Sequence, residues 1–186
     1  MQPKSATDVF SEWALIGKDK GMESGHSPSV KQMLELAIPK LGEDFSAIDL
    51  GCGNGWVTRL LTKLGASHSE GVDGAKEMIN KAQEIDSMHK YSHGHLPEWR
   101  PEQKFDLVHS MEFLHYLQDP AQMIAMIHDN WLNDGGILVA GVDHYKEHEE
   151  SLTWPEHVGV HMTTLNITQW KDAMLSAGFT EVEIHQ

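Results

Sequence analysis

A glycine-rich loop, GCGNG, most limits what this chain can fold into. It follows a short apolar run at 45–50, which ends at glycine and predicts a buried strand. It precedes a segment with apolar residues at helical spacing, which Gly65 ends. Glycine permits positive φ angles and close approach of backbone to a ligand, and the next helix presents free N–H groups there. This order predicts a ligand site at the end of a parallel strand.

Patterns that suit helices and strands alternate along almost the whole chain. The alternation predicts a layered α/β fold with a mainly parallel sheet. The expected strands cover 45–50, 69–72, 90–92, 105–108, 137–140 and 181–185. The expected helices cover 8–20, 28–41, 57–64, 75–82, 120–131 and 170–177, with a polar loop, GMESGH, between the first two.

Length and charge restrict the partners of this chain. A length of 186 residues suits a single domain, 1–186, with a substantial core. Fourteen Lys and Arg against 28 Asp and Glu give a net charge of −14, which repels phosphate backbones and anionic membranes. We therefore expect no nucleic-acid and no membrane partner. The only cysteine, Cys52, cannot form an internal disulfide, which fits a reducing cytoplasmic location.

A second acidic residue helps to identify the ligand. Asp73 ends the strand that follows the loop, where a carboxylate can accept hydrogen bonds from both ribose hydroxyls of a nucleoside-bearing cofactor. The dinucleotide fingerprint G-x-G-x-x-G requires glycine where this chain has Trp56. A bulky indole there obstructs the helix–strand packing of that motif. An NAD-dependent oxidoreductase is therefore the less favoured interpretation.

The segment from Asp49 to Gly55 resembles the motif [D/E]-x-G-x-G-x-G of class I S-adenosylmethionine (SAM) methyltransferases. The chain looks most like their small-molecule branch, which includes quinone-biosynthesis enzymes. Four further segments match the family in order: GVDGAKEMINKAQ, FDLVHSMEFLHYLQDP, NDGGILVAGV and ITQWKDAMLSAGFTEVEI. The resemblance implies a Rossmann-like, doubly wound sheet of six or seven strands with helices on both faces. It also implies SAM as cofactor and S-adenosylhomocysteine (SAH) as product.

In such proteins the cofactor lies across the C-terminal ends of the strands, where open α/β sheets generally bind ligands. The resemblance implies that Asp49 and the glycine loop hold the methionine portion and that Asp73 binds the ribose. His95 stands near an acid that many relatives use at the adenine, and a neutral imidazole can accept the same hydrogen bond. The implied cofactor-binding residues are Asp49, Gly51, Cys52, Gly53, Asn54, Gly55, Asp73, Gly74, Met78, His95, Leu96, Ser110, Met111 and Glu112.

The catalytic residues are not identified by the sequence. Methyl transfer is an in-line displacement that depends largely on alignment and desolvation, and it needs a base only where the acceptor carries a proton. His115, His144 and Tyr145 are the candidates, because they follow the fourth and fifth expected strands. Packing beside the cofactor is the alternative for His115, and an exposed loop position is the alternative for His144.

Two stretches outside the expected core can cover the site. Residues 1–29 are expected to form an N-terminal helical lid or a peripheral capping helix, and 143–164 an irregular, substrate-facing insertion with Trp154 as an apolar wall. The lid residues expected to face the cofactor are Trp13, Met22, Glu23 and His26. In the insertion, His144 and His148, like His157 and His161, have the spacing of metal ligands on a helix. Pro155 and Gly159 interrupt such a helix, so we expect no metal site.

Three functions remain open. The first is methyl transfer from SAM to O, N or another nucleophile of a small molecule. The second is a non-enzymatic SAM- or metal-binding protein on the same fold, and the third is the oxidoreductase. The family usually has a seventh strand, whereas this sequence stops at Gln186 after the expected sixth. An uncovered edge strand can pair with another chain, so we expect a monomer or a homodimer.

Overall fold

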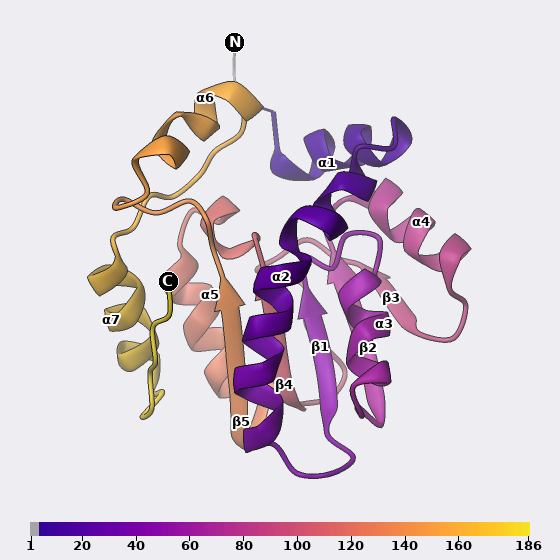
Figure 1. Cartoon of the computed structure of the whole chain (residues 1–186), viewed down its shortest axis with the longest axis vertical. Coiled ribbons are helices and arrows are strands. Elements are labelled where there is room, and N and C mark those ends of the chain that lie inside the picture. The colour runs from indigo at the N-terminus through magenta and orange to yellow at the C-terminus, as the bar shows by residue number, and fades with distance from the viewer. Residues whose placement is uncertain (1–3) are drawn as a thin grey trace.

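The computed structural model describes residues 4–186, and its core is a parallel sheet with helices on both faces (Figure 1). The strand order is β3-β2-β1-β4-β5, and every neighbouring pair is parallel. The strands are β1 (Ser46–Leu50), β2 (His68–Asp73), β3 (Lys90–His93), β4 (Phe105–Met111) and β5 (Leu132–Gly141). The order reverses between β1 and β4, where open α/β sheets bind ligands. The predicted α/β class and parallel sheet are confirmed.

Helices cover both faces because alternate strand residues point to opposite sides. Ala47 of β1 belongs to the cluster around Leu61 of α3, whereas Ile48 belongs to the cluster around Ile124 of α5. Figure 1 shows α2 and α3 in front of the sheet. The helices are α1 (Ala6–Leu15), α2 (Asp19–Ala37), α3 (Trp56–Lys63), α4 (Lys76–Ile85), α5 (Pro120–Met126), α6 (Trp154–Val158) and α7 (Ile167–Ala177). Shorter helical turns cover Ile38–Lys40, Leu114–Tyr116, Ile127–Trp131 and Glu149–Thr153.

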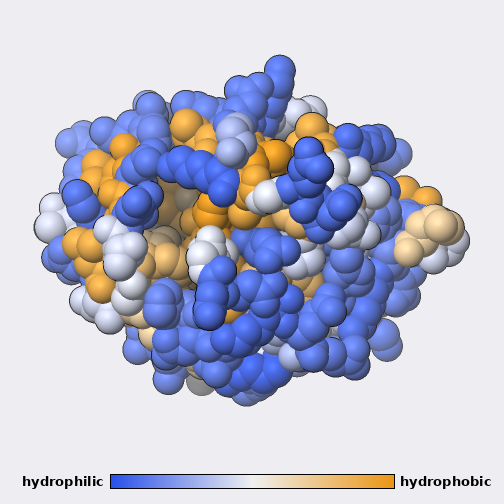
Figure 2. Space-filling model, turned by 90° about the horizontal axis from the view of Figure 1, so that it is seen from below, coloured by the Kyte–Doolittle hydropathy of each residue, from blue (hydrophilic) through white to orange (hydrophobic). Residues whose placement is uncertain are grey.

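The prediction of six or seven strands is wrong, because the described residues form five. Residues 181–185, the expected sixth strand, have no strand conformation. Together with β5, α2 and α7 they line a cavity of about 380 Å³, here called the edge cavity. Figure 2 shows a hollow with hydrophobic residues in its walls on the side of the molecule where Figure 1 places α7. Strands must lie about 4.8 Å apart to pair, so this gap leaves 181–185 without a partner.

The predicted loop GMESGH is also wrong, because it lies inside α2. Pro28, expected in the first turn of a new helix, stands within this longer helix. Contacts outside the helix hold its first turn. The buried Asp19 carboxylate accepts hydrogen bonds from Lys81 Nζ at 2.6 Å and Asn54 Nδ2 at 2.9 Å. Tertiary contacts therefore outweigh the loop-like composition of this segment.

The lid region packs against the insertion. Lys4 N–H donates to the carbonyl of Gly159 at 3.1 Å, and Val9 of α1 clusters with Val160 and Met162. The insertion is less irregular than predicted, because Pro155 stands in the first turn of α6 and Gly159 ends it with a φ of 74°. Among residues 4–186, no helix is both long and apolar enough to span a membrane.

Candidate functional site

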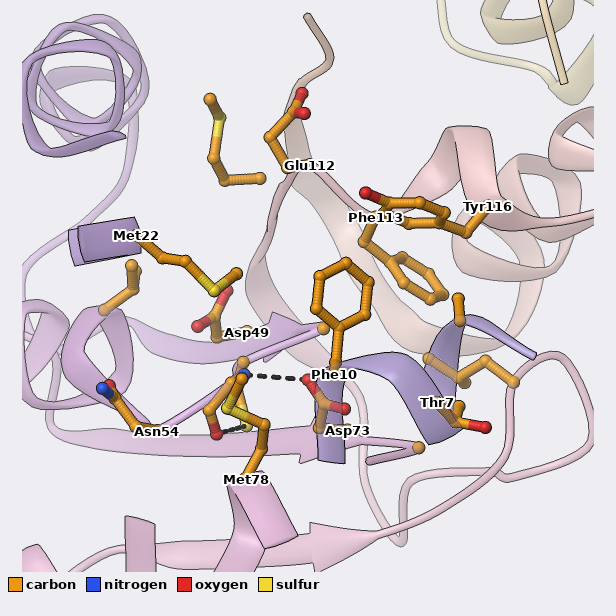
Figure 3. A pocket seen from close by; sticks show the side chains of 18 of the residues that line it. Thr7, Phe10, Met22, Asp49, Asn54, Asp73, Met78, Glu112, Phe113 and Tyr116 are labelled. Carbon is orange, nitrogen blue, oxygen red and sulfur yellow. Dashed lines mark hydrogen bonds between the residues drawn. The ribbon is translucent and has the colours of Figure 1, made fainter. Parts of the chain in front are cut away.

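A cavity of about 370 Å³, here called the main cavity, lies at the C-terminal ends of β1, β2 and β4. Side chains from the strand ends form its floor, and α1 and the first part of α2 cover it (Figure 3). Its position at the reversal of strand order is the one that the fold predicts for a ligand site.

The glycine loop forms one wall of the main cavity. Gly51, Gly53 and Gly55 have φ angles of 69°, 52° and 78°, which residues other than glycine rarely adopt. A Cβ at Gly51 would stand 2.8 Å from Phe113 Cβ, whereas a Cβ at Gly53 would approach nothing nearer than Met78 Sδ at 4.0 Å. The backbone at Gly53 is therefore open to a ligand in the cavity.

Asp73 holds this loop in place from the end of β2. Its carboxylate accepts the N–H of Gly53 at 2.9 Å on one oxygen and the N–H of Ala75 at 2.7 Å on the other. Burial raises the pKa of Asp73, and the nearby Asp49 adds to that rise. Each carboxylate oxygen can accept a second hydrogen bond, so Asp73 can also hold hydroxyl groups of a ligand.

Asp49 is paired with a histidine that the sequence analysis did not identify. His109 Nδ1 lies 2.6 Å from Asp49 Oδ1, and both side chains are buried and line the cavity. A carboxylate can only accept, so Nδ1–H donates. Nε2 of His109 has no partner among residues 4–186, and neither has Oδ1 of Asn54. Two buried polar atoms beside this cavity therefore lack a hydrogen-bond partner within the described residues.

The covering wall comes from the lid region and faces aromatic residues after β4. Phe10 of α1 meets Tyr116 edge to face, with ring centroids 5.2 Å apart (Figure 3). Met22 and His26 of α2 line the cavity. The expected lid residues Trp13 and Glu23 do not line it, and Trp13 packs behind Phe10 with ring centroids 5.2 Å apart.

The structure brings most of the predicted cofactor-binding residues to this cavity. Gly55 and Ser110 are the exceptions. Gly55 precedes α3, and Ser110 is fully buried in β4. Burial raises the pKa of the Cys52 thiol well above its usual value, which favours the protonated form. The predicted residues that line the cavity are Asp49, Gly51, Cys52, Gly53, Asn54, Asp73, Gly74, Met78, His95, Leu96, Met111 and Glu112.

None of the three candidate catalytic residues lines the main cavity. His115 is fully buried, and burial together with the nearby His144 lowers its pKa to about 3. The ring nitrogens of His144 lie 3.0 Å from the Ser151 carbonyl and 2.8 Å from Thr164 Oγ1. Tyr145 lines the edge cavity instead. Residues 143–164 contribute nothing to the main cavity wall, so a substrate-facing role for this insertion stays a prediction.

Glu112 has an environment unlike that of any other carboxylate in the main cavity. Its φ of 54° is left-handed, and its carboxylate accepts the N–H of Asp143. Burial, reinforced by the negative charge of Asp143, raises the pKa of Glu112 to about 8. Atoms of His26, Glu112 and Asp143 that could ligate a metal all lie within 4.8 Å of one another. The sequence analysis did not connect these three residues, because they belong to separate elements.

The sequence of this chain matches a known protein family over most of its length. The sequence profile described as a methyltransferase domain matches residues 23–184. The trans-aconitate 2-methyltransferase of Agrobacterium fabrum is 29% identical over 144 residues, which cover 77% of this chain and 53% of that protein. The chain spans about half the length of the curated relatives it matches.

Two solved structures are similar over most of their length. One is a chain of the complex between the Haloferax volcanii Trm112 methyltransferase activator and a methyltransferase, with a TM-score of 0.82 and 31% identity. That alignment covers 91% of this chain and 75% of the other. A SAM-dependent methyltransferase from Mesorhizobium loti has a TM-score of 0.68 and 25% identity, with 83% and 81% covered. By its profile match and its fold, this chain belongs to the class I SAM-dependent methyltransferases of the methyltransferase domain family.

Proposed function

We propose that this chain binds SAM in the main cavity and transfers its methyl group to a small-molecule acceptor. The observation that carries the proposal is the arrangement of Asp73 and Gly53, a carboxylate and an open backbone segment that are hydrogen-bonded to each other beside the same cavity. Support for a small-molecule acceptor comes from the likeness to an enzyme named for trans-aconitate.

The residues present suit the parts of this cofactor. Asp73 would accept the ribose hydroxyls, and Met78 and Leu96 would border the adenine. The unpartnered atoms of His109 and Asn54 would receive the polar groups of the methionine portion, which supplies both hydrogen-bond donors and acceptors. A buried polar atom without a partner costs about 1–3 kcal/mol, so binding that supplies partners is favoured.

Bound SAM supplies a methyl group activated by a positively charged sulfur. The protein's part is to align the acceptor with the S–CH₃ bond and to exclude water. Phe10 of the covering wall, with Phe113 and Tyr116 opposite it, would exclude water from the cavity. Transfer of this methyl group to an acceptor atom would leave the carbon–sulfur electron pair on sulfur, with SAH as the product. An acceptor that carries a proton must also lose that proton, to a base or to water.

Replacing Asp73 tests this site directly. We expect Asp73→Ala to weaken SAH binding by about 1–3 kcal/mol, roughly 5- to 150-fold, because hydrogen bonds to the ribose and to the Gly53 backbone are lost together. Isothermal titration with SAH measures the change, and an NAD titration of the wild-type chain should show no binding. Asp134→Ala, at an exposed position of β5, is the matched control and should bind SAH normally. Equal affinity of the Asp73→Ala and wild-type proteins would contradict the assignment.

We extend the proposal to a partner protein and to the oligomeric state of this chain. A neighbour in fold was solved in a complex with a methyltransferase activator, and we propose that this chain too can act with a partner. Size-exclusion chromatography with light scattering separates a monomer, a homodimer and a hetero-complex.

A further inference from the structure

Three side chains from separate elements meet between the two cavities. His26 comes from the covering part of α2, Glu112 from the end of β4 and Asp143 from the residues after β5. All three are half-buried, and their potential ligand atoms lie within 4.8 Å of one another. His26 and Glu112 line the main cavity, whereas Asp143 lines the edge cavity. The cluster therefore separates the proposed cofactor site from a second space.

The two carboxylates of this cluster are held together without a basic partner. The N–H of Asp143 donates to the Glu112 carboxylate, which keeps the two residues in contact. Within residues 4–186, no Lys or Arg forms an ion pair with either acid. Two carboxylates close together in a half-buried place repel each other, and a proton or a cation relieves that repulsion.

His26 provides the third group. Its imidazole forms no hydrogen bond within the described part of the chain, so its ring nitrogens are free to act as ligands. A neutral imidazole ligates Zn²⁺ and other first-row metals, whereas a protonated one does not. The cluster thus offers one nitrogen and two carboxylate ligands.

We propose that His26, Glu112 and Asp143 bind a divalent first-row metal ion. Three protein ligands leave at least one coordination position open, as in metal sites that bind substrates. The role of this open position rests on the proposed function. There an oxygen of the acceptor's carboxylate or hydroxyl group binds the metal beside the cofactor. The sequence analysis considered only histidines of the insertion as metal ligands and rejected them because Pro155 and Gly159 interrupt a helix, so it did not bring His26, Glu112 and Asp143 together.

Bound metal also connects the lid to the sheet, because His26 is the ligand that comes from α2. Ion binding to the folded state alone raises the stability of that state in proportion to the logarithm of ion concentration. We therefore expect Zn²⁺ to raise the melting temperature of the whole chain, and this shift to disappear when one ligand is replaced.

The test uses the complete chain and the metal alone as probe. Zn²⁺ is titrated calorimetrically, and Co²⁺ is followed by its visible absorption, which reports ligand geometry. Glu112→Gln keeps the shape of the side chain and removes its charge, and it should weaken Zn²⁺ binding at least about tenfold. Asp143→Asn and His26→Gln should do the same. The matched control is His157→Gln with His161→Gln, which should leave Zn²⁺ affinity unchanged.

Parallel titration with SAH separates the metal site from the proposed function. SAH binding without any Zn²⁺ signal overturns the metal site and supports the cofactor site. Zn²⁺ binding without any SAH signal supports the metal site and overturns the cofactor site. Zn²⁺ binding that survives Glu112→Gln but is lost in the His157 and His161 variant also overturns the proposal, because the ion then binds the insertion. Circular dichroism confirms that each variant is folded before its titration is interpreted.

Discussion

We expect the free energy of unfolding to fall steeply as the pH drops below 6.5, and a His115→Leu variant to lose much of that fall. His115 is fully buried, neither ring nitrogen has a partner among residues 4–186, and burial lowers its pKa to about 3. In the unfolded chain its pKa is about 6.5. Between these values the unfolded chain binds a proton that the folded protein does not, so stability is complete above pH 6.5 and is lost as the pH falls towards 3.

The effect is large because the two pKa values lie far apart. Each pH unit well inside this window costs about 1.4 kcal/mol, so the wild-type chain should lose roughly 2 kcal/mol between pH 6.5 and 4.5 from His115 alone. Leucine cannot be protonated and replaces a ring that packs 4.1 Å from the Tyr116 ring centroid. Some acid sensitivity should remain, because burial also lowers the pKa of His144.

Urea denaturation at several pH values, followed by tryptophan fluorescence, gives both stability curves. The exposed His157 provides the control, since His157→Leu should leave the wild-type pH dependence in place. Parallel curves for the His115→Leu and wild-type proteins would show that His115 is not the group responsible.

Addition of one methyl group should mainly affect stability at Gly55 and mainly affect SAH affinity at Gly53. At Gly55 a Cβ would stand 2.4 Å from Cε1 of the buried Tyr91, whose hydroxyl donates to Asp86 at 2.8 Å. The backbone strain at a φ of 78° adds to this overlap. Gly55→Ala should therefore lower the free energy of unfolding by roughly 2–5 kcal/mol.

At Gly53 the same substitution meets no protein atom within 3.9 Å, because the nearest is Met78 Sδ at 4.0 Å. Gly53→Ala should thus cost only about 1–2 kcal/mol of backbone strain. Its methyl group points into the space proposed for the cofactor, so SAH affinity should fall at least about tenfold.

Thermal melts and SAH titrations of both variants check this contrast. Gly55→Ala, measured at a temperature where it is folded, should retain more SAH affinity than Gly53→Ala, because Gly55 does not line the main cavity. A Gly53→Ala protein that binds SAH like the wild type would show that this backbone does not touch the cofactor.

Features of the site that are local in the chain could be predicted from the sequence. A buried strand, three closely spaced glycines and an amphipathic helix specify a loop with positive φ angles wherever the rest of the chain goes, because glycine alone adopts them easily. Asp73 could also be predicted, because an acid at the end of the next parallel strand lies at the same edge of the sheet as the glycine loop.

Contacts between distant segments could not be predicted. His109 faces Asp49 because β1 and β4 are neighbours in a register that pairs these two residues, and the sequence does not contain that register. The helical conformation of GMESGH depends on Asp19 reaching Lys81 and Asn54. The expected strand at 181–185 has the right residue pattern, but a strand forms only where a neighbour offers its backbone.

By itself, the sequence determined the class of fold, the glycine loop and the acid beside it, because each depends on the conformational preferences of adjacent residues. Only the tertiary structure decided which side chains cover the cavity, which histidine holds Asp49 and that His26, Glu112 and Asp143 meet. The reason is physical: these groups are brought together by strand order and helix packing, and their burial, charge and pKa values arise only after the chain has folded.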